Sequence, residues 1–225
     1  MAQLQIPMID KSFYNSTTAL ANKKVVENKI RPNYGSYIKA SSANSGIPEE
    51  MLESFIYIES AGNPNAGTTA VGLMQIGAAG ASDVIVQEKQ KGRMTQAEEA
   101  IMKKYLGTTY DKTIASLKKG QMSAGTWVSK SLLYKPEFNI AVGAMYLKQL
   151  IDEFTTKDGV RMDKVIAIYN TGRYSSTAKK IIPSKKPIST LLADMPTVTK
   201  SYVLKLVGKN LKIKHETHGI LNLIG

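Results

Sequence analysis

Residues 48–60 read PEEMLESFIYIES, an amphipathic pattern in which a proline and two carboxylates stand first. Pro48 fits the first turn of a helix, and Glu49 and Glu50 suit the positive end of the helix dipole. The apolar stripe of this segment consists of Leu52, Phe55 and Ile56. The pattern predicts a helix over 48–60 with one buried face.

Glu59 follows the three apolar residues of this stripe by seven, four and three positions. At about 100° per residue it falls in the same sector of the helix. Burial against an apolar wall keeps a carboxyl group protonated, as a general acid near neutral pH requires. A structural role is the alternative, with the side chain turned to solvent or paired with a lysine. Glu50 and Glu53 lie away from this face, and we expect them to be solvated charges.

The rest of the chain predicts further helices, and no strand of convincing length or internal repeat is evident. A strong helix is predicted over 136–154, where apolar residues recur every three or four positions. Others are predicted near 163–171 and 196–208, with weaker signals near 95–106 and 111–118. The predicted fold class is therefore mainly α.

The net charge of +12 resides at the two ends of the chain. Residues 1–47 carry six basic and two acidic side chains, residues 48–171 fourteen of each, and residues 172–225 ten and two. Basic flanks around a neutral centre favour an anionic partner, such as nucleic acid, acidic lipid or cell envelope, although a lysine run can also be a solvated face. The lysines of the C-terminal end alternate with aliphatic residues and lack an aromatic stacking platform, which disfavours nucleic acid.

Composition excludes several kinds of chemistry. The 225 residues include no cysteine, which excludes disulfides, thiol catalysis and thiolate metal sites. With only two histidines, His215 and His218, a histidine-rich metal site is not expected. We expect no metal and no cofactor. No run approaches 18 apolar residues, so no membrane-spanning helix is predicted. The first 24 residues lack the pattern of a secretory signal peptide, and we expect none.

A second motif, AVGLMQI, covers residues 70–76 after the polar turn NPNA at 63–66. Gly72 permits a close backbone approach, Met74 offers an adaptable apolar surface, and Gln75 carries both a donor and an acceptor. These groups suit an uncharged polar ligand such as a sugar. Core packing is the alternative role for such an apolar run.

Four motifs in this order resemble the soluble lytic transglycosylase family. They are Glu59-Ser60 with the NPNA turn, GLMQ at 72–75, NIAVGAMYL at 139–147 and AIYNTG at 167–172. The resemblance covers about residues 44–208, and it implies a lysozyme-like, goose-type helical fold that cleaves peptidoglycan. The chain departs from the family after Ile76, where GAAGA replaces the usual proline and threonine.

The resemblance also implies a role for each motif residue. Glu59 is expected to be the catalytic acid and then the base, with Ser60 supporting its geometry. Tyr169 is expected to hold the catalytic carboxyl, and Asn170 to shape the same site. Core packing is the alternative for Tyr169, and a helix cap is the alternative for Asn170. The expected substrate-binding residues are Ser60, Gly72, Leu73, Met74, Gln75, Tyr169 and Asn170.

The implied reaction breaks the β-1,4 bond between N-acetylmuramic acid and N-acetylglucosamine and forms a 1,6-anhydromuramoyl end. A hydrolytic goose-type lysozyme is the alternative, and Asp83 is the first candidate for its second carboxylate. Another alternative is a catalytically silent virion structural or envelope-binding protein with the same fold.

The predicted organisation is an N-terminal extension over 1–43, a catalytic domain over 44–208 and a basic tail over 209–225. We expect a bacteriophage protein that acts in the periplasm or cell wall, either carried in the virion with other virion proteins or released at lysis as an endolysin. An exported bacterial secretion-system enzyme would look similar. The basic flanks are expected to hold the enzyme on the anionic cell envelope.

Overall fold

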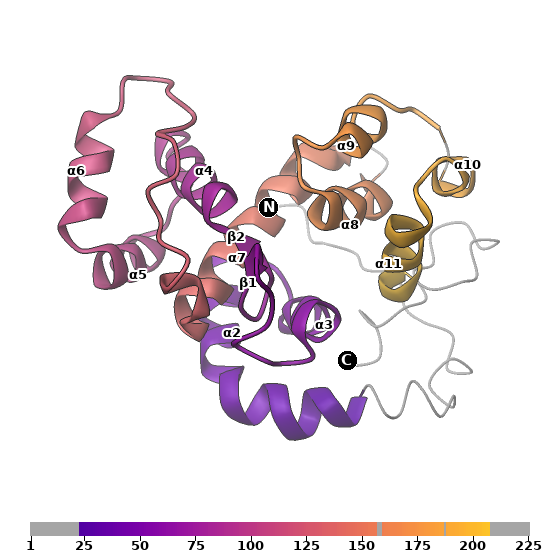
Figure 1. Ribbon diagram of the computed structural model, residues 1–225, viewed down its shortest axis with the longest axis horizontal. Helices are drawn as coiled ribbons and strands as arrows, with labels where there is room; N and C mark the ends of the chain where they lie inside the picture. Colours follow the sequence, from indigo (N-terminus) through magenta and orange to yellow (C-terminus); the bar gives the residue numbers. More distant parts are fainter. Residues whose placement is uncertain (1–22, 157–158, 187, 208–225) are drawn as a thin grey trace. The chain divides into compact units, whose positions relative to one another are not determined.

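The computed structural model describes residues 23–156, 159–186 and 188–207 and consists mainly of helices (Figure 1). The mainly α class predicted from the sequence is confirmed. Residues Val25–Lys148 form one compact unit, here called the N-terminal unit. The described residues from Gln149 onward belong to a second one, the C-terminal unit. None of the helices in the described ranges has both the length and the hydropathy that a membrane span requires.

The N-terminal unit begins with three consecutive helical segments. They are the π-helical η2 (Val26–Ile30), α2 (Arg31–Ser45) and α3 (Glu49–Ser60). Val26, Ile30 and Ile38 are buried where η2 and α2 pack with α3. The predicted extension over 1–43 is thus part of the folded unit from residue 25 onward, and residues 1–22 lie outside the described part. Because α2 has few apolar residues, its periodicity does not stand out in the sequence.

A short hairpin and three helices follow. They are β1 (Ala70–Val71), β2 (Ile76–Gly77), α4 (Ala78–Gln90), α5 (Gln96–Leu106) and α6 (Thr108–Ser116). The two strands are antiparallel, with Ala70 opposite Gly77 and Val71 opposite Ile76. Helix α4 was not predicted, because its Ala- and Gly-rich start carries no clear stripe. The helices predicted near 95–106 and 111–118 are confirmed as α5 and α6, although α6 begins three residues earlier.

The predicted helix over 136–154 is confirmed as α7 (Pro136–Phe154), which follows the 3-10 turn η3 (Leu132–Tyr134). Phe138, Ile140 and Leu147 are fully buried. Gly143 lies against Met74, since a Cβ atom on Gly143 would stand 2.5 Å from the Met74 sulfur. The turn between β1 and β2 therefore packs directly on α7.

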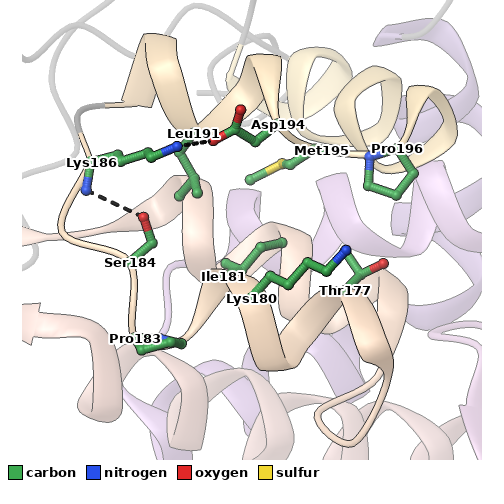
Figure 2. Close-up of a pocket in the computed structure, with 10 residues that line it drawn as sticks. All are labelled: Thr177, Lys180, Ile181, Pro183, Ser184, Lys186, Leu191, Asp194, Met195 and Pro196. Atoms are coloured by element: carbon green, nitrogen blue, oxygen red, sulfur yellow. Dashed lines mark hydrogen bonds and ion pairs between the residues drawn. The ribbon is translucent and has the colours of Figure 1, made fainter.

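The C-terminal unit contains a second hairpin and four helices. They are β3 (Thr155–Thr156), β4 (Gly159–Val160), α8 (Met162–Thr171), α9 (Ser176–Ile181), α10 (Ile188–Ala193) and α11 (Thr197–Val207). Helices α8 and α11 confirm the helices predicted near 163–171 and 196–208. Helix α8 packs against α9 and α11. A cavity of about 800 Å³ lies between α9 and the segment that joins α10 to α11 (Figure 2). The predicted tail over 209–225 lies outside the described residues.

Candidate functional site

Glu59 stands in the last turn of α3, where the buried face of the helix meets the surface. Phe55 and Ile56 on the preceding turn are fully buried, whereas Glu59 is half-buried. The helix ends just beyond it, at Ala61, which has a left-handed backbone with φ of 48°. A non-glycine residue in this region is uncommon and often marks a functional or strained turn. Glu59 thus follows a fully buried turn of the helix and is itself half-buried.

Ser60 connects this end of α3 to the second motif. Its Oγ lies 2.8 Å from the main-chain oxygen of Leu73 and 3.0 Å from that of Ile56. The single hydroxyl hydrogen is therefore shared between the helix itself and a residue thirteen positions away. The Glu59-Ser60 and GLMQ motifs, which are separate in the sequence, meet through this bond.

The GLMQ segment is a tight turn that its own side chains hold closed. Gly72 has a φ of 82°, and a Cβ atom there would stand 2.3 Å from the oxygen of Leu133 and 2.4 Å from Nδ2 of Asn139. Gln75 is a second non-glycine residue with a left-handed backbone, at a φ of 47°. Its Nε2 donates to the oxygens of Ala66 at 3.0 Å and Gly72 at 2.8 Å. In this conformation the amide nitrogen of Gln75 is used within the turn.

Leu73 and Met74 face inward from the same turn. Both side chains are fully buried. The main-chain N–H of Met74 donates to the Oδ1 atom of Asn139 at 2.7 Å. The expected contact of these two residues with a glycan stays a prediction; in this conformation neither residue is exposed, and the oxygen of Leu73 and the N–H of Met74 are bonded to Ser60 and Asn139.

Asn139 on α7 is the residue that sequence reasoning missed, although it opens the third motif. It is fully buried, and its Nδ2 donates to the oxygens of Val71 at 2.9 Å and Leu133 at 2.8 Å. With the bond accepted from Met74, one amide satisfies three main-chain groups of two loops. The available signal was a polar side chain among the apolar residues at the start of a predicted buried helix. Such a side chain needs a hydrogen-bond partner.

Two basic residues at the junction of η2 and α2 contact α3, one at the middle of the helix and one at its C-terminal end. Arg31 makes a bidentate ion pair with Glu53, at 2.6 and 2.9 Å. The ammonium group of Lys29 donates to the main-chain oxygen of Ala61 at 2.8 Å, just past the end of the helix. Cationic groups suit the negative end of a helix dipole. These contacts position the helix that carries Glu59.

The expectation that Glu53 is a solvated charge is wrong. Its side chain is 4% exposed in the ion pair with Arg31. Burial raises the pKa of Glu53 above its usual value, and the hydrogen bonds from Arg31 oppose that rise only in part. The helical angle was estimated correctly, but α2 covers a face of α3 that was taken to meet water.

Tyr169 and Asn170 lie on α8 in the C-terminal unit. Tyr169 is buried and Asn170 is half-buried. The hydroxyl of Thr171 donates to the oxygen of Ala167 at 2.9 Å, and the helix is followed by Gly172, whose φ is 77°. Because Glu59 belongs to the other unit, the expected contact between Tyr169 and Glu59 stays a prediction.

Other carboxylates of the N-terminal unit have partners of their own. Asp83 on α4 accepts a hydrogen bond from the hydroxyl of Ser123. Glu137, at the start of α7, accepts hydrogen bonds from Lys104 and, at 2.7 Å, from the hydroxyl of Tyr105. These contacts give both groups a structural function within the unit.

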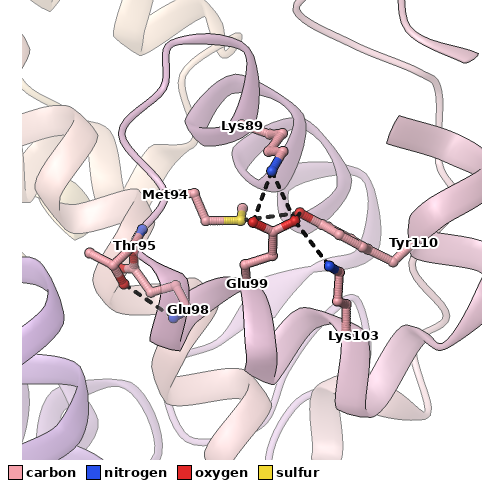
Figure 3. A network of polar contacts seen from close by, with 7 residues as sticks. All are labelled: Lys89, Met94, Thr95, Glu98, Glu99, Lys103 and Tyr110. Atoms are coloured by element: carbon pink, nitrogen blue, oxygen red, sulfur yellow. Dashed lines mark hydrogen bonds and ion pairs between the residues drawn. The ribbon is translucent and has the colours of Figure 1, made fainter. Parts of the chain in front are cut away.

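Glu99 on α5 has two lysines beside it, more than the other carboxylates described above (Figure 3). Lys89 donates to its two oxygens at 2.8 and 2.9 Å, Tyr110 donates at 3.2 Å, and Lys103 lies at 3.5 Å. The hydrogen bond from Lys89 lowers the pKa of Glu99, and burial raises the pKa of Tyr110. A carboxylate kept ionised in this way ties α4, α5 and α6 together and is unsuited to donate a proton.

Comparisons with known proteins identify the family of this chain. The family model "Transglycosylase SLT domain" matches residues 36–117 and 106–191. The membrane-bound lytic murein transglycosylase E of Buchnera aphidicola subsp. Acyrthosiphon pisum (strain APS) is 24% identical over 215 residues, which are 93% of this chain and 77% of that protein.

Among solved structures, an inactive mutant of the lytic transglycosylase Slt from Pseudomonas aeruginosa is similar at a TM-score of 0.46 and 18% identity. The match covers 76% of this chain and 22% of that chain. This chain thus spans about a fifth of the length of that solved protein.

Proposed function

Because the chain belongs to the transglycosylase SLT domain family, we propose that it is a peptidoglycan lytic transglycosylase with Glu59 as its single catalytic carboxyl group. The bond cleaved is the β-1,4 linkage between N-acetylmuramic acid and N-acetylglucosamine. The observation that carries the proposal is the bond from Ser60 to the main-chain oxygen of Leu73. It joins the end of α3, directly after the half-buried Glu59, to the GLMQ turn, and it thereby supports a site formed by these two motifs.

In the first step the protonated Glu59 gives its proton to the glycosidic oxygen as the bond from C1 to that oxygen breaks. The positive charge that develops at C1 is supported by the substrate's own acetamido group. In the second step the ionised Glu59 takes the proton of the muramoyl 6-hydroxyl, and the oxygen of that hydroxyl bonds to C1. The proton count of the enzyme is restored, and the product is a 1,6-anhydro sugar formed without water.

The environments of three other carboxylates of the N-terminal unit support a mechanism with one acid. A hydrolase of the two-carboxylate kind needs a second group that is free to activate water or attack C1. Asp83 is bonded to Ser123, Glu53 to Arg31 and Glu137 to Lys104 and Tyr105. Each of these groups is held by its own partner.

The test is mass spectrometry of the products that the full-length protein releases from purified peptidoglycan. We expect anhydromuramoyl ends, which are lighter than the hydrolysed products by one water. Glu59→Gln should reduce the rate by at least about 10² because the amide cannot donate and recover a proton. Glu50→Gln, in the first turn of the same helix, is the matched control and should stay close to wild type.

Two outcomes would replace the proposal. Reducing muramoyl ends as the main product would identify a hydrolytic lysozyme. No release by the wild-type protein, with intact folding, would favour the silent structural or envelope-binding alternative. Delivery in a bacteriophage particle, and retention on the envelope by the basic flanks, stay predictions from the sequence.

A further inference from the structure

The segment that joins α6 to η3, residues 117–131 and here called the strap, contains no helix or strand and runs beside α4 (Figure 1). We propose that Ser82 on α4 is a positioning residue for the GLMQ turn, which it holds through the strap and η3. Ser82 directly follows the GAAGA stretch in which the sequence differs from the family. This inference rests on the proposed function, because that function assigns the GLMQ turn to the candidate site.

The hydroxyl of Ser82 is fully engaged in hydrogen bonds. The residue is buried, and its Oγ donates to the main-chain oxygen of Ala78 at 2.8 Å. The same atom accepts from the main-chain N–H groups of Trp127 and Val128, at 3.0 Å each. A serine hydroxyl has one donor and two acceptor positions, and all three are used here. Ser82 therefore fastens the end of the strap to the N-terminal half of α4.

From this attachment the hydrogen bonds lead back to the GLMQ turn. Two main-chain bonds of 3.1 and 3.2 Å close a tight turn over residues 129–133. The oxygen of Leu133 accepts from Nδ2 of Asn139, whose Oδ1 accepts from the N–H of Met74. A Cβ atom on Gly72 would stand 2.3 Å from the same Leu133 oxygen, so the backbone of the turn lies directly against η3.

These contacts form a closed circuit, because α4 also follows the GLMQ turn along the chain. Strand β2 begins directly after Gln75, and α4 begins directly after β2. The circuit thus runs from the turn through α4 to Ser82, then through the strap and η3 to Asn139 and back to the turn. A shift of the turn must bend or break a bond of this circuit, in addition to the bond from Ser60.

Other attachments of the strap to α4 lie further from η3 along the chain and are exposed. Ser123 donates to Asp83, and the side-chain amide of Gln90 bonds to main-chain groups of residues 118 and 120. Water competes for exposed hydrogen bonds, so each contributes little to holding the strap. The buried attachment at Ser82 therefore governs the end of the strap that leads to η3.

Trp127 makes this end of the strap depend on Ser82. Its Nε1 atom is buried and has no hydrogen-bond partner among the described residues, so the indole holds the strap by packing alone. Removing the Ser82 hydroxyl would leave the main-chain N–H groups of Trp127 and Val128 without their acceptor as well. Buried donors without partners are costly, so we expect this part of the strap to leave α4 when the hydroxyl is removed.

The first experiment is amide hydrogen exchange of the full-length protein, measured by NMR without substrate. We expect the Met74 amide to exchange at least about tenfold faster in Ser82→Ala than in wild type, relative to the slowest amides of α7, which report global unfolding. Ser45→Ala is the matched control. The buried hydroxyl of Ser45 also donates to a carbonyl four residues earlier and accepts from a main-chain N–H, at 2.7 and 3.2 Å, but it is not part of the circuit. Its relative exchange at Met74 should match wild type.

The second measurement is fluorescence, since Trp127 is the one tryptophan of the chain and reports on the strap alone. We expect acrylamide to quench its emission more strongly in folded Ser82→Ala than in wild type or Ser45→Ala. Ser82→Cys should show smaller changes of the same sign in exchange and quenching, because a thiol is a weak donor and acceptor. This variant keeps both measurements possible if Ser82→Ala does not fold.

Cleavage kinetics give the functional readout. A looser GLMQ turn weakens binding of the ground and transition states alike, so Ser82→Ala should raise KM for peptidoglycan about three- to tenfold and change kcat by less than about twofold. A loss of stability alone lowers the amount of active enzyme, which reduces the apparent kcat and leaves KM unchanged.

Three outcomes would overturn the inference: relative exchange at Met74 that stays at the wild-type rate in both Ser82 variants, equal quenching of Trp127 in these variants and wild type, or equal KM values for Ser82→Ala and Ser45→Ala. Exchange and quenching are measured without substrate and do not depend on cleavage. Failure of the circuit is thereby distinguished from failure of the proposed reaction.

Discussion

The hydroxyl of Ser60, the residue directly after Glu59, donates a hydrogen bond to the main-chain oxygen of Leu73 at 2.8 Å. The two residues belong to different motifs, and both motifs are bounded by a non-glycine residue with a left-handed backbone, Ala61 and Gln75. Among the described residues outside glycine, these are the two with positive φ. The bond thus joins two strained turns, and this arrangement fixes where the end of α3 lies relative to the GLMQ turn.

Replacing Ser60 with alanine tests whether this link positions the catalytic group. We expect Ser60→Ala to lower kcat by about tenfold, because a small displacement of a catalytic group is costly, and to lower the free energy of unfolding by only about 1 kcal/mol. Steady-state cleavage and urea unfolding measure the two effects. Ser54→Ala is the control, since Ser54 also donates to a carbonyl one turn back on α3, at 2.7 Å. Equal kcat values for the two variants would show that the link is only structural.

Gly72→Ala should destabilise the N-terminal unit. The new Cβ atom would stand 2.3 Å from a main-chain oxygen, at a φ of 82° that disfavours every L side chain. We expect a loss of at least about 2 kcal/mol. Gly80→Ala is the control, because Gly80 lies within α4 with nothing within 4 Å of a Cβ atom, and it should stabilise by about 0.5–1 kcal/mol. Thermal unfolding of both variants is the measurement, and shifts of the same sign would contradict the prediction.

Asn139→Asp preserves the size of the side chain and removes its two donors. A carboxylate at this buried position would face the oxygens of Val71 and Leu133, which now accept from Nδ2. We expect a loss of about 2–4 kcal/mol at neutral pH, from two lost bonds and a buried charge. Asn33→Asp, which removes one exposed bond to the oxygen of Lys29, should cost less than about 1 kcal/mol. Comparable unfolding midpoints for the two variants would refute the role of Asn139.

Arg31→Gln should produce a stability loss that depends on pH. It leaves Glu53 buried without its cation, and burial already raises the pKa of Glu53. The cost of the ionised carboxylate is therefore greatest near pH 7, at about 1–3 kcal/mol, and it shrinks as falling pH protonates the group. Unfolding at about pH 7 and about pH 4 measures the difference from wild type.

Lys29→Gln is the control for that experiment. Lys29 donates to the oxygen of Ala61, a group that does not titrate, so its smaller loss should stay the same over this pH range. If the losses for the two variants change in parallel with pH, the pH effect does not come from Glu53.

The helices of this protein could be predicted from the sequence because their signals are local. The spacing of apolar residues gave α7 its bounds, and a proline followed by carboxylates marked the start of α3. The order of four short motifs was enough to indicate the family that the comparisons support. Each of these signals lies within one or two turns of chain.

The tertiary structure alone decided which of these residues hold one another. Asn139 bonds to Met74 and Val71 across more than sixty positions, and Ser60 to Leu73 across thirteen. Glu53 was misjudged because one helix pattern shows which residues share a face but not which second helix covers it. Burial and long-range hydrogen bonds depend on how distant segments pack, and periodicity along a single segment carries no information about that packing.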